Sequence, residues 1–139
     1  MLQSVKEDIY RYEGERCTNL LVRIKYALFP GTRTLWLIRH YQAASNPFTR
    51  ILWKVLCYLD KYSTGVQIPP QTKIDKGCRI LHFGTIVIHP DSVIGKNFNI
   101  AQGTLIGSNT GKRCGSPIIG NNVCMFANSI VLGGGKHWR

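Results

Sequence analysis

The chain has 139 residues, 44% of them hydrophobic and 18% charged, which suits one globular domain with a modest core. Its formal net charge is +11, and both halves are basic, so anionic partners such as a phosphorylated cofactor or a lipid surface are favoured. The sequence contains no apolar run of the roughly 20 residues that cross a bilayer, no signal peptide at its N-terminus, and no nucleic-acid recognition motif.

The first 64 residues have the periodicity of amphipathic helices with basic outer faces. Pro30-Gly31 ends the first apolar stripe, and Ser45-Asn46-Pro47 ends the second. The stripes contain Leu21, Ile24 and Leu28, then Leu35, Ile38 and Tyr41, and finally Ile51, Leu52, Val55, Leu56 and Leu59. We expect a small helical cap that packs on the rest of the chain or at an oligomer contact. Trp36 and Trp53 among Arg and Lys leave peripheral membrane contact as the alternative.

From residue 65 onward the apolar positions recur every six residues, which fits neither a helix nor an ordinary strand. Three series have this step: Ile68, Ile74, Ile80 and Ile86; then Ile88, Ile94, Ile100 and Ile106; and then Ile119, Met125 and Val131. Small or β-branched residues recur four places after the aliphatic residue, at Thr72, Ser92, Thr104, Val123 and Ser129. The offsets between the series predict one slightly enlarged corner and a larger excursion at 108–115.

Such hexads are typical of a triangular coil in which each six residues form one short strand and one tight turn. The aliphatic residue points into the prism, and Gly and Asn occupy turns that need unusual backbone angles. Residues 65–139 therefore predict about four coils of a left-handed parallel β-helix, and the fold class is mainly β with a helical N-terminal region at 1–64. The alternative, a set of unrelated β-hairpins, would not keep isoleucine in phase.

The C-terminal tail departs from the repeat. The next aliphatic residue is due at position 137, where the chain has His137. We therefore expect the β-helix to be truncated at its C-terminus, either because the chain is a fragment or because the gene is frameshifted there.

The five cysteines are odd in number and widely spaced, at positions 17, 57, 78, 114 and 124. They form no CxxC pair and no Cys/His cluster, so no metal site is expected. Their pattern is typical of reduced thiols in a cytoplasmic protein.

The segment from "GVQIPPQTKIDKGCRILHFGT" to "GSPIIGNNVCMFANSIVLGG" resembles serine O-acetyltransferases, especially the short members found among capsule and surface-sugar genes. The resemblance implies transfer of acetyl from acetyl-CoA to a hydroxyl by a homotrimer, or a hexamer, with active sites between neighbouring subunits. It also implies that His82, in "ILHFGT", is the catalytic histidine. His82 follows the inward Ile80 near a corner, so it can face outward and act as a general base. His89, in "IHPD", is the competing base, whereas His40 and His137 are weaker candidates.

Four residues depart from the family pattern around this histidine. Gln67 and Leu81 stand where the family has aspartates, and Gly115-Ser116 stands where an Arg-His pair helps to hold the carboxylate of serine. A backbone carbonyl or Gln67 could then hold the tautomer of His82. Because this chain lacks the charged pair that helps to hold the carboxylate of serine, a sugar hydroxyl becomes a candidate acceptor beside L-serine.

The resemblance places the pantetheine arm of acetyl-CoA along the coil edges, where Gly107 and Ala127 occupy matching positions. Lys112 and Arg113, in the excursion, are candidates for the CoA phosphates, with a solvated loop as the alternative. The sequence thus predicts an acetyl-CoA-dependent O-acetyltransferase acting on serine or on a sugar in polysaccharide synthesis. The competing hypothesis is a catalytically silent β-helix that acts as an assembly or interaction module.

Overall fold

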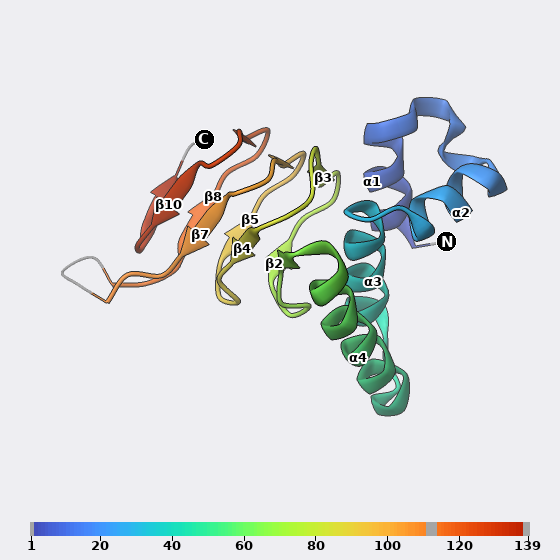
Figure 1. Cartoon of the computed structure of the whole chain (residues 1–139), viewed down its shortest axis with the longest axis horizontal. Coiled ribbons are helices and arrows are strands. Elements are labelled where there is room, and N and C mark those ends of the chain that lie inside the picture. Colours follow the sequence, from blue (N-terminus) through green and yellow to red (C-terminus); the bar gives the residue numbers. More distant parts are fainter. Residues whose placement is uncertain (1, 111–113, 138–139) are drawn as a thin grey trace.

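The structure, a computed structural model, describes residues 2–110 and 114–137 and has a helical end and a strand-built end (Figure 1). The helices gather near the N-terminus, and the strands stack in successive layers away from them towards the C-terminus. The helical elements are α1 (Gln3–Glu13), the 3-10 helix η1 (Gly14–Thr18), α2 (Leu20–Leu28), α3 (Thr32–Ala43) and α4 (Pro47–Thr64).

The described strands form three parallel sheets, which we name A, B and C. Sheet A contains β1 (Val66–Gln67), β4 (Ile86–Ile88), β7 (Leu105–Gly107) and β10 (Ile130–Leu132). Sheet B contains β2 (Lys73–Ile74), β5 (Val93–Ile94), β8 (Pro117–Ile119) and β11 (Gly135–His137). Sheet C contains β3 (Arg79–Ile80), β6 (Asn99–Ile100) and β9 (Cys124–Met125). The chain visits A, B and C in that order on every turn, which confirms the predicted parallel β-helix.

The hexad positions form the interior of the prism, as the periodicity predicts. Ile88, Ile100 and Ile106 are at most 2% exposed, and Ile106 pairs with Ile88 on the neighbouring coil. The enlarged corner lies between β3 and β4. Arg79 pairs with Asn99 on the next coil, and Val87 pairs with Leu105. The chain therefore advances 87 − 79 = 8 residues around this corner, but only 105 − 99 = 6 residues around the equivalent corner of the next coil. The excursion begins and ends at the antiparallel bridge between Asn109 and Gly115.

The sequence predicts a small or β-branched side chain at the position four residues after each aliphatic residue. The structure confirms this prediction on some coils and corrects it on one. Thr72, Ser92 and Thr104 are fully buried there. Phe98, four residues after Ile94, is fully buried as well, so one coil fills this slot with a ring. The prism interior therefore tolerates one large side chain where its neighbours in the stack are small.

One row of corners shows why asparagine and glycine recur between sheets B and C. Gly77, Asn97 and Asn122 stack there with φ values of 76°, 57° and 59°, in the left-handed region that disfavours most side chains. The Nδ2 of Asn97 donates to Oδ1 of Asn122 at 3.0 Å. The side chains thus join successive coils while the backbone makes the tight turn.

A buried ion pair ties the helices to the first coil. Arg39 of α3 donates from Nε to Oδ2 of Asp8 of α1 at 2.9 Å, and both side chains are almost completely buried. Asp8 also accepts from the backbone N–H of Cys78 at 2.9 Å, and Arg39 donates to the carbonyl of Asp75 at 2.7 Å. The pair therefore satisfies backbone groups of the β-helix as well as its own charges.

The apolar faces of α2 and α4 are exposed, which differs from the packing expected for a cap on its own β-helix. In α3, Leu35, Ile38 and Tyr41 are buried as predicted. In α4, by contrast, a row at helical spacing is between 50% and 81% exposed: Phe48, Ile51, Leu52, Val55, Tyr58, Leu59 and Tyr62. We call this row the α4 stripe. Among the described helices, none has both the length and the apolar character required to cross a membrane.

The buried thiol of Cys78 should make the free energy of unfolding depend on pH. Burial, reinforced by the nearby Asp8 carboxylate, raises the pKa of the Cys78 thiol from 9.0 to about 12. Because this thiol keeps its proton in the folded state, its contribution to the free energy of unfolding is complete below pH 9. The contribution falls by about 1.4 kcal/mol per pH unit as the pH rises from 9 towards 12. Urea unfolding at pH 8, 9 and 10 should show a steeper loss for the native chain than for Cys78→Ala. Equal slopes would contradict this origin.

Candidate active site

His82 lies on the enlarged corner between β3 and β4. Ile80 anchors this corner in the prism, and Gly84 and Thr85, with φ of 111° and 51°, turn the chain back into β4. The side chain of His82 is exposed, as its position after Ile80 predicted. Within residues 2–110 and 114–137 it accepts and donates no hydrogen bond, and the predicted partner Gln67 is not bonded to it. The described residues of one copy therefore leave both ring nitrogens of His82 available.

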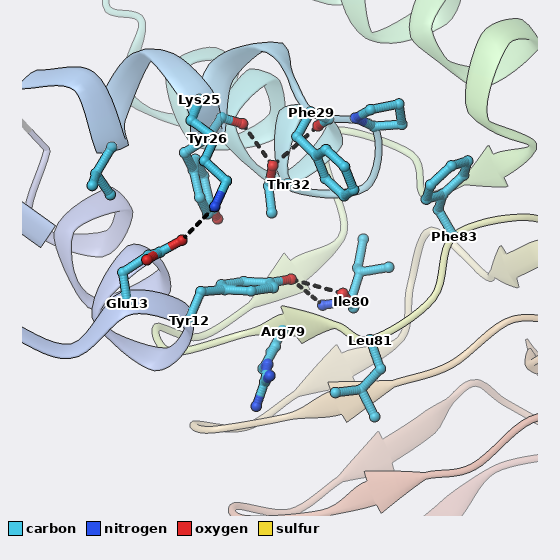
Figure 2. A pocket seen from close by; sticks show the side chains of 12 residues that line it. Tyr12, Glu13, Lys25, Tyr26, Phe29, Thr32, Arg79, Ile80, Leu81 and Phe83 are labelled. Carbon is cyan, nitrogen blue, oxygen red and sulfur yellow. Dashed lines mark hydrogen bonds and ion pairs between the residues drawn. The ribbon is translucent and has the colours of Figure 1, made fainter. Parts of the chain in front are cut away.

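Both sequence neighbours of His82 line a cavity of about 340 Å³ between the first coil and the helices (Figure 2). We call it the tyrosine pocket. Leu81 and Phe83 form its side nearest the corner, and Phe29 meets Phe83 edge to face at 6.3 Å between ring centroids. The other lining residues are Tyr12, Glu13, Val22, Lys25, Tyr26, Pro30, Thr32, Arg79 and Ile80. The volume falls in the range of small-molecule sites.

The pocket contains two buried phenols with different partners. The hydroxyl of Tyr12 donates to the carbonyl of Ile80 at 2.9 Å and accepts from its N–H at 2.6 Å. The hydroxyl of Tyr26 is buried without a hydrogen-bond partner among the described residues, and it points towards Tyr12 (Figure 2). Burial raises the pKa of both phenols well above 10, so both stay protonated at neutral pH. A buried hydroxyl without a protein partner is the kind of group that an ordered water satisfies.

Three charged side chains complete the pocket wall. Lys25 pairs with Glu13 at 3.0 Å, and the guanidinium of Arg79 lies 5.2 Å from the centroid of the Tyr12 ring. The flat aromatic faces and the polar groups suit a small ligand that has an apolar face and hydroxyl groups.

A second histidine lies at a different corner. His89 follows β4, and its Nδ1 lies 3.0 Å from the hydroxyl oxygen of Ser116, which precedes β8 one coil further on. The same Nδ1 accepts from the backbone N–H of Asp91 at 3.3 Å. His89 is thus held by polar partners on two coils.

The two CoA candidates that the structure describes, Gly107 and Ala127, lie on one coil but not at one corner. Gly107 ends β7 next to the corner between sheets A and B, whereas Ala127 is exposed in the turn after β9, between sheets C and A. A Cβ at Gly107 would come within 2.8 Å of Leu132, so this glycine makes room for Leu132. Lys112 and Arg113 lie outside the described residues. A CoA-binding role for these four residues stays a prediction.

The remaining candidates have structural contacts. His40 lies 2.8 Å from the carbonyl of Trp36 and packs against the rings of Trp36 and Trp53. His137 pairs in register with Ile119, the place where the repeat calls for an aliphatic residue. All five cysteines are free, and the described part of the chain has no group of three or more potential metal ligands.

Sequence reasoning did not identify the tyrosine pocket or the contact between His89 and Ser116. One signal for the pocket was present, because Asp8 and Tyr12 lie four residues apart on α1 and share the helix face that meets the first coil. The contact of His89 with Ser116 had no such signal, since the excursion separates the two residues along the chain.

Comparison with known proteins shows what this arrangement is similar to. The chain is 32% identical over 140 residues to the serine acetyltransferase of Staphylococcus epidermidis, covering 96% of this chain and 63% of that protein. The chain is thus similar to serine acetyltransferases over almost its whole length. It therefore spans a little under two thirds of the length of this relative, and no family model matches it.

Solved structures of serine acetyltransferases resemble this chain as well. Serine acetyltransferase isoform 3 of Entamoeba histolytica, in complex with cysteine, matches 95% of this chain and 48% of its own, with a TM-score of 0.70 and 28% identity. A serine acetyltransferase in complex with CoA matches 94% of this chain and 54% of its own, with a TM-score of 0.72 and 25% identity. The fold is accordingly the left-handed β-helix of these enzymes, preceded by helices, as the hexads predicted.

Proposed function

We propose that the chain is an acetyl-CoA-dependent O-acetyltransferase in which His82 is the general base. The observation that carries the proposal is an exposed imidazole at a β-helix corner, flanked by two residues of the tyrosine pocket. The similarity to serine acetyltransferases, one of them in complex with CoA, supports the same reaction.

The reaction needs few groups from the protein. The neutral imidazole of His82 takes the proton of the acceptor hydroxyl as its oxygen attacks the thioester carbonyl. The tetrahedral oxyanion then collapses, the carbon–sulfur bond breaks, and the CoA thiolate takes the proton back from the imidazolium. The products are the acetyl ester and CoA, and no covalent intermediate on the protein is required.

The acceptor is the hydroxyl of L-serine or of a sugar. Serine is supported by the names of the relatives. A sugar is supported by the aromatic lining of the tyrosine pocket, because sugar rings pack on aromatic faces. A homotrimer is part of the proposal, since the exposed α4 stripe provides an apolar surface for association.

Incubation with acetyl-CoA and each candidate acceptor tests the proposal. CoA should be quantified by chromatography, because thiol reagents would also react with the exposed Cys114 and Cys124. We expect CoA release that depends on one acceptor, with an acetylated product of the corresponding mass. A folded, oligomeric sample that releases no CoA above background hydrolysis with any acceptor would instead favour the silent assembly module.

A further inference from the structure

We propose that the exposed apolar face of α2 docks the protein on an anionic lipid surface, with the helix lying flat among the headgroups. This face consists of four residues that are between 47% and 75% exposed: Leu20, Leu21, Ile24 and Leu28. We call them the α2 row. The contact lies outside the tyrosine pocket, so it is independent of the proposed reaction.

The α2 row and the tyrosine pocket use different sides of one helix. Val22 and Tyr26, one turn apart, line the pocket, and Tyr26 is buried there. Leu21, Ile24 and Leu28 follow the i, i+3, i+7 spacing of a second face, which is exposed. A lipid surface in contact with the α2 row therefore leaves the pocket free to bind its own ligand.

Cations border the α2 row on both sides. With 3.6 residues per helical turn, Arg23 projects at one margin of the row and Lys25 at the other, and α2 contains no acidic residue. Glu13 and Glu15, the nearest preceding acids, are engaged by Lys25 and by the hydroxyl of Tyr10. An apolar row between cations is the pattern of a helix that lies in the headgroup layer of a membrane.

Charge complementarity decides which occupant this face suits. An anionic bilayer offers hydrocarbon to the leucines and phosphates to the bordering cations. Another copy of the chain would instead bring a net charge of +11 to the same contact. The geometry agrees, because α2 has nine residues, too few to span a bilayer, and lies at the outer margin of the helical end (Figure 1).

The α2 row differs from the membrane contact that the sequence favoured. Trp36 lies 4.1 Å from the ring of His40, measured between centroids, and meets Trp53 edge to face at 5.4 Å. Both tryptophans are only partly exposed. They therefore form an aromatic cluster between α3 and α4, and the leucines of α2 provide the exposed apolar surface instead.

Sedimentation with lipid vesicles tests the contact. The chain should bind vesicles of phosphatidylcholine with added phosphatidylglycerol at least about 10-fold more tightly than vesicles of phosphatidylcholine alone, because Arg23 and Lys25 both face the headgroups. High salt should weaken the binding to anionic vesicles. A folded sample that does not sediment with anionic vesicles would overturn the proposal.

Substitutions in α2 locate the contact. Leu21→Gln should weaken binding to anionic vesicles about 10-fold, since one leucine no longer leaves water. Phe126, directly after β9, is 71% exposed against 75% for Leu21, so Phe126→Gln is the matched control and should bind like the native chain. Native binding by Leu21→Gln would refute the assignment to α2.

The cation at the margin of the row has its own control. Arg23→Gln should bind anionic vesicles about 5-fold more weakly and neutral vesicles equally, whereas Arg23→Lys keeps the charge and should match the native chain. Light scattering without lipid completes the test. A lower oligomer mass for Leu21→Gln would show that another copy covers the α2 row, contrary to the proposal.

A fluorescent label tests the same face directly. In a chain with Cys114→Ser and Cys124→Ser, an environment-sensitive dye on Leu28→Cys should shift its emission to the blue when anionic vesicles are added, and a dye on Phe126→Cys should not. The parent chain without an added cysteine gives the background labelling. A shift for Val55→Cys of α4 but not for Leu28→Cys would place the contact on the α4 stripe and overturn the proposal. None of these measurements depends on acetyl transfer.

Discussion

Replacement of His82 by alanine is expected to lower kcat by about 10²- to 10⁴-fold, the usual contribution of a positioned general base. The side chain is exposed, so its removal should leave the melting temperature nearly unchanged. His82→Gln keeps polar atoms but cannot accept the proton as a base, so it should be as slow as His82→Ala. Rates measured at saturating acetyl-CoA and acceptor separate this loss from weaker binding.

A further measurement identifies the lost group as an imidazole. The alanine variant leaves an open space at an exposed corner, so added free imidazole should restore part of the rate in a concentration-dependent way. Its lack of effect on the native chain is the control. If His82→Ala turns over at the native rate, another group is the base, and His89 is then the first residue to substitute.

The prism interior was predictable from the sequence because a six-residue step has few structural explanations. Each of the strands β2 to β10 contains at least one hexad position, and two changes of phase predict the enlarged corner and the excursion. Phe98 was not predictable, since an interior slot next to small side chains can be filled by one ring from the same coil.

The surface of the helices was less predictable for a physical reason. Periodicity shows that a helix has an apolar face but not which body covers it. The face of α3 is covered by the β-helix, whereas the α4 stripe has the same pattern and is exposed in one copy of the chain. A helix that packs against its own chain and a helix that packs against another copy are indistinguishable by sequence spacing.

The candidate site likewise contains residues that the sequence predicted and residues that it did not. His82 was predictable because it lies two residues after the inward Ile80 and within the motif that resembles the family. The tyrosine pocket was not predictable, because Tyr12, Tyr26 and Phe83 come from three elements that meet only when the helices dock on the first coil. That docking depends on the buried pair of Asp8 and Arg39, which links the stability of the chain to the geometry of its site.

Removal of one charge from this pair should be the most destabilising single change to the fold. Asp8→Asn leaves the guanidinium of Arg39 buried without its counter-ion, and such losses cost about 3–5 kcal/mol. The free energy of unfolding in urea, measured at fixed protein concentration because association contributes to it, gives the size of the effect. The tyrosine pocket should open at the same time, since Asp8 and Tyr12 lie on α1 together.

The adjacent residue supplies the matched control. Glu7 also accepts from a lysine, Lys76, at 2.8 Å, but this pair lies at the surface, so Glu7→Gln should change the free energy of unfolding far less than Asp8→Asn. The double variant Asp8→Leu with Arg39→Met removes both charges and should be more stable than either single variant, because it leaves no unpaired charge in the interior. If Asp8→Asn and Glu7→Gln cost the same, the buried pair does not hold the helices on the first coil.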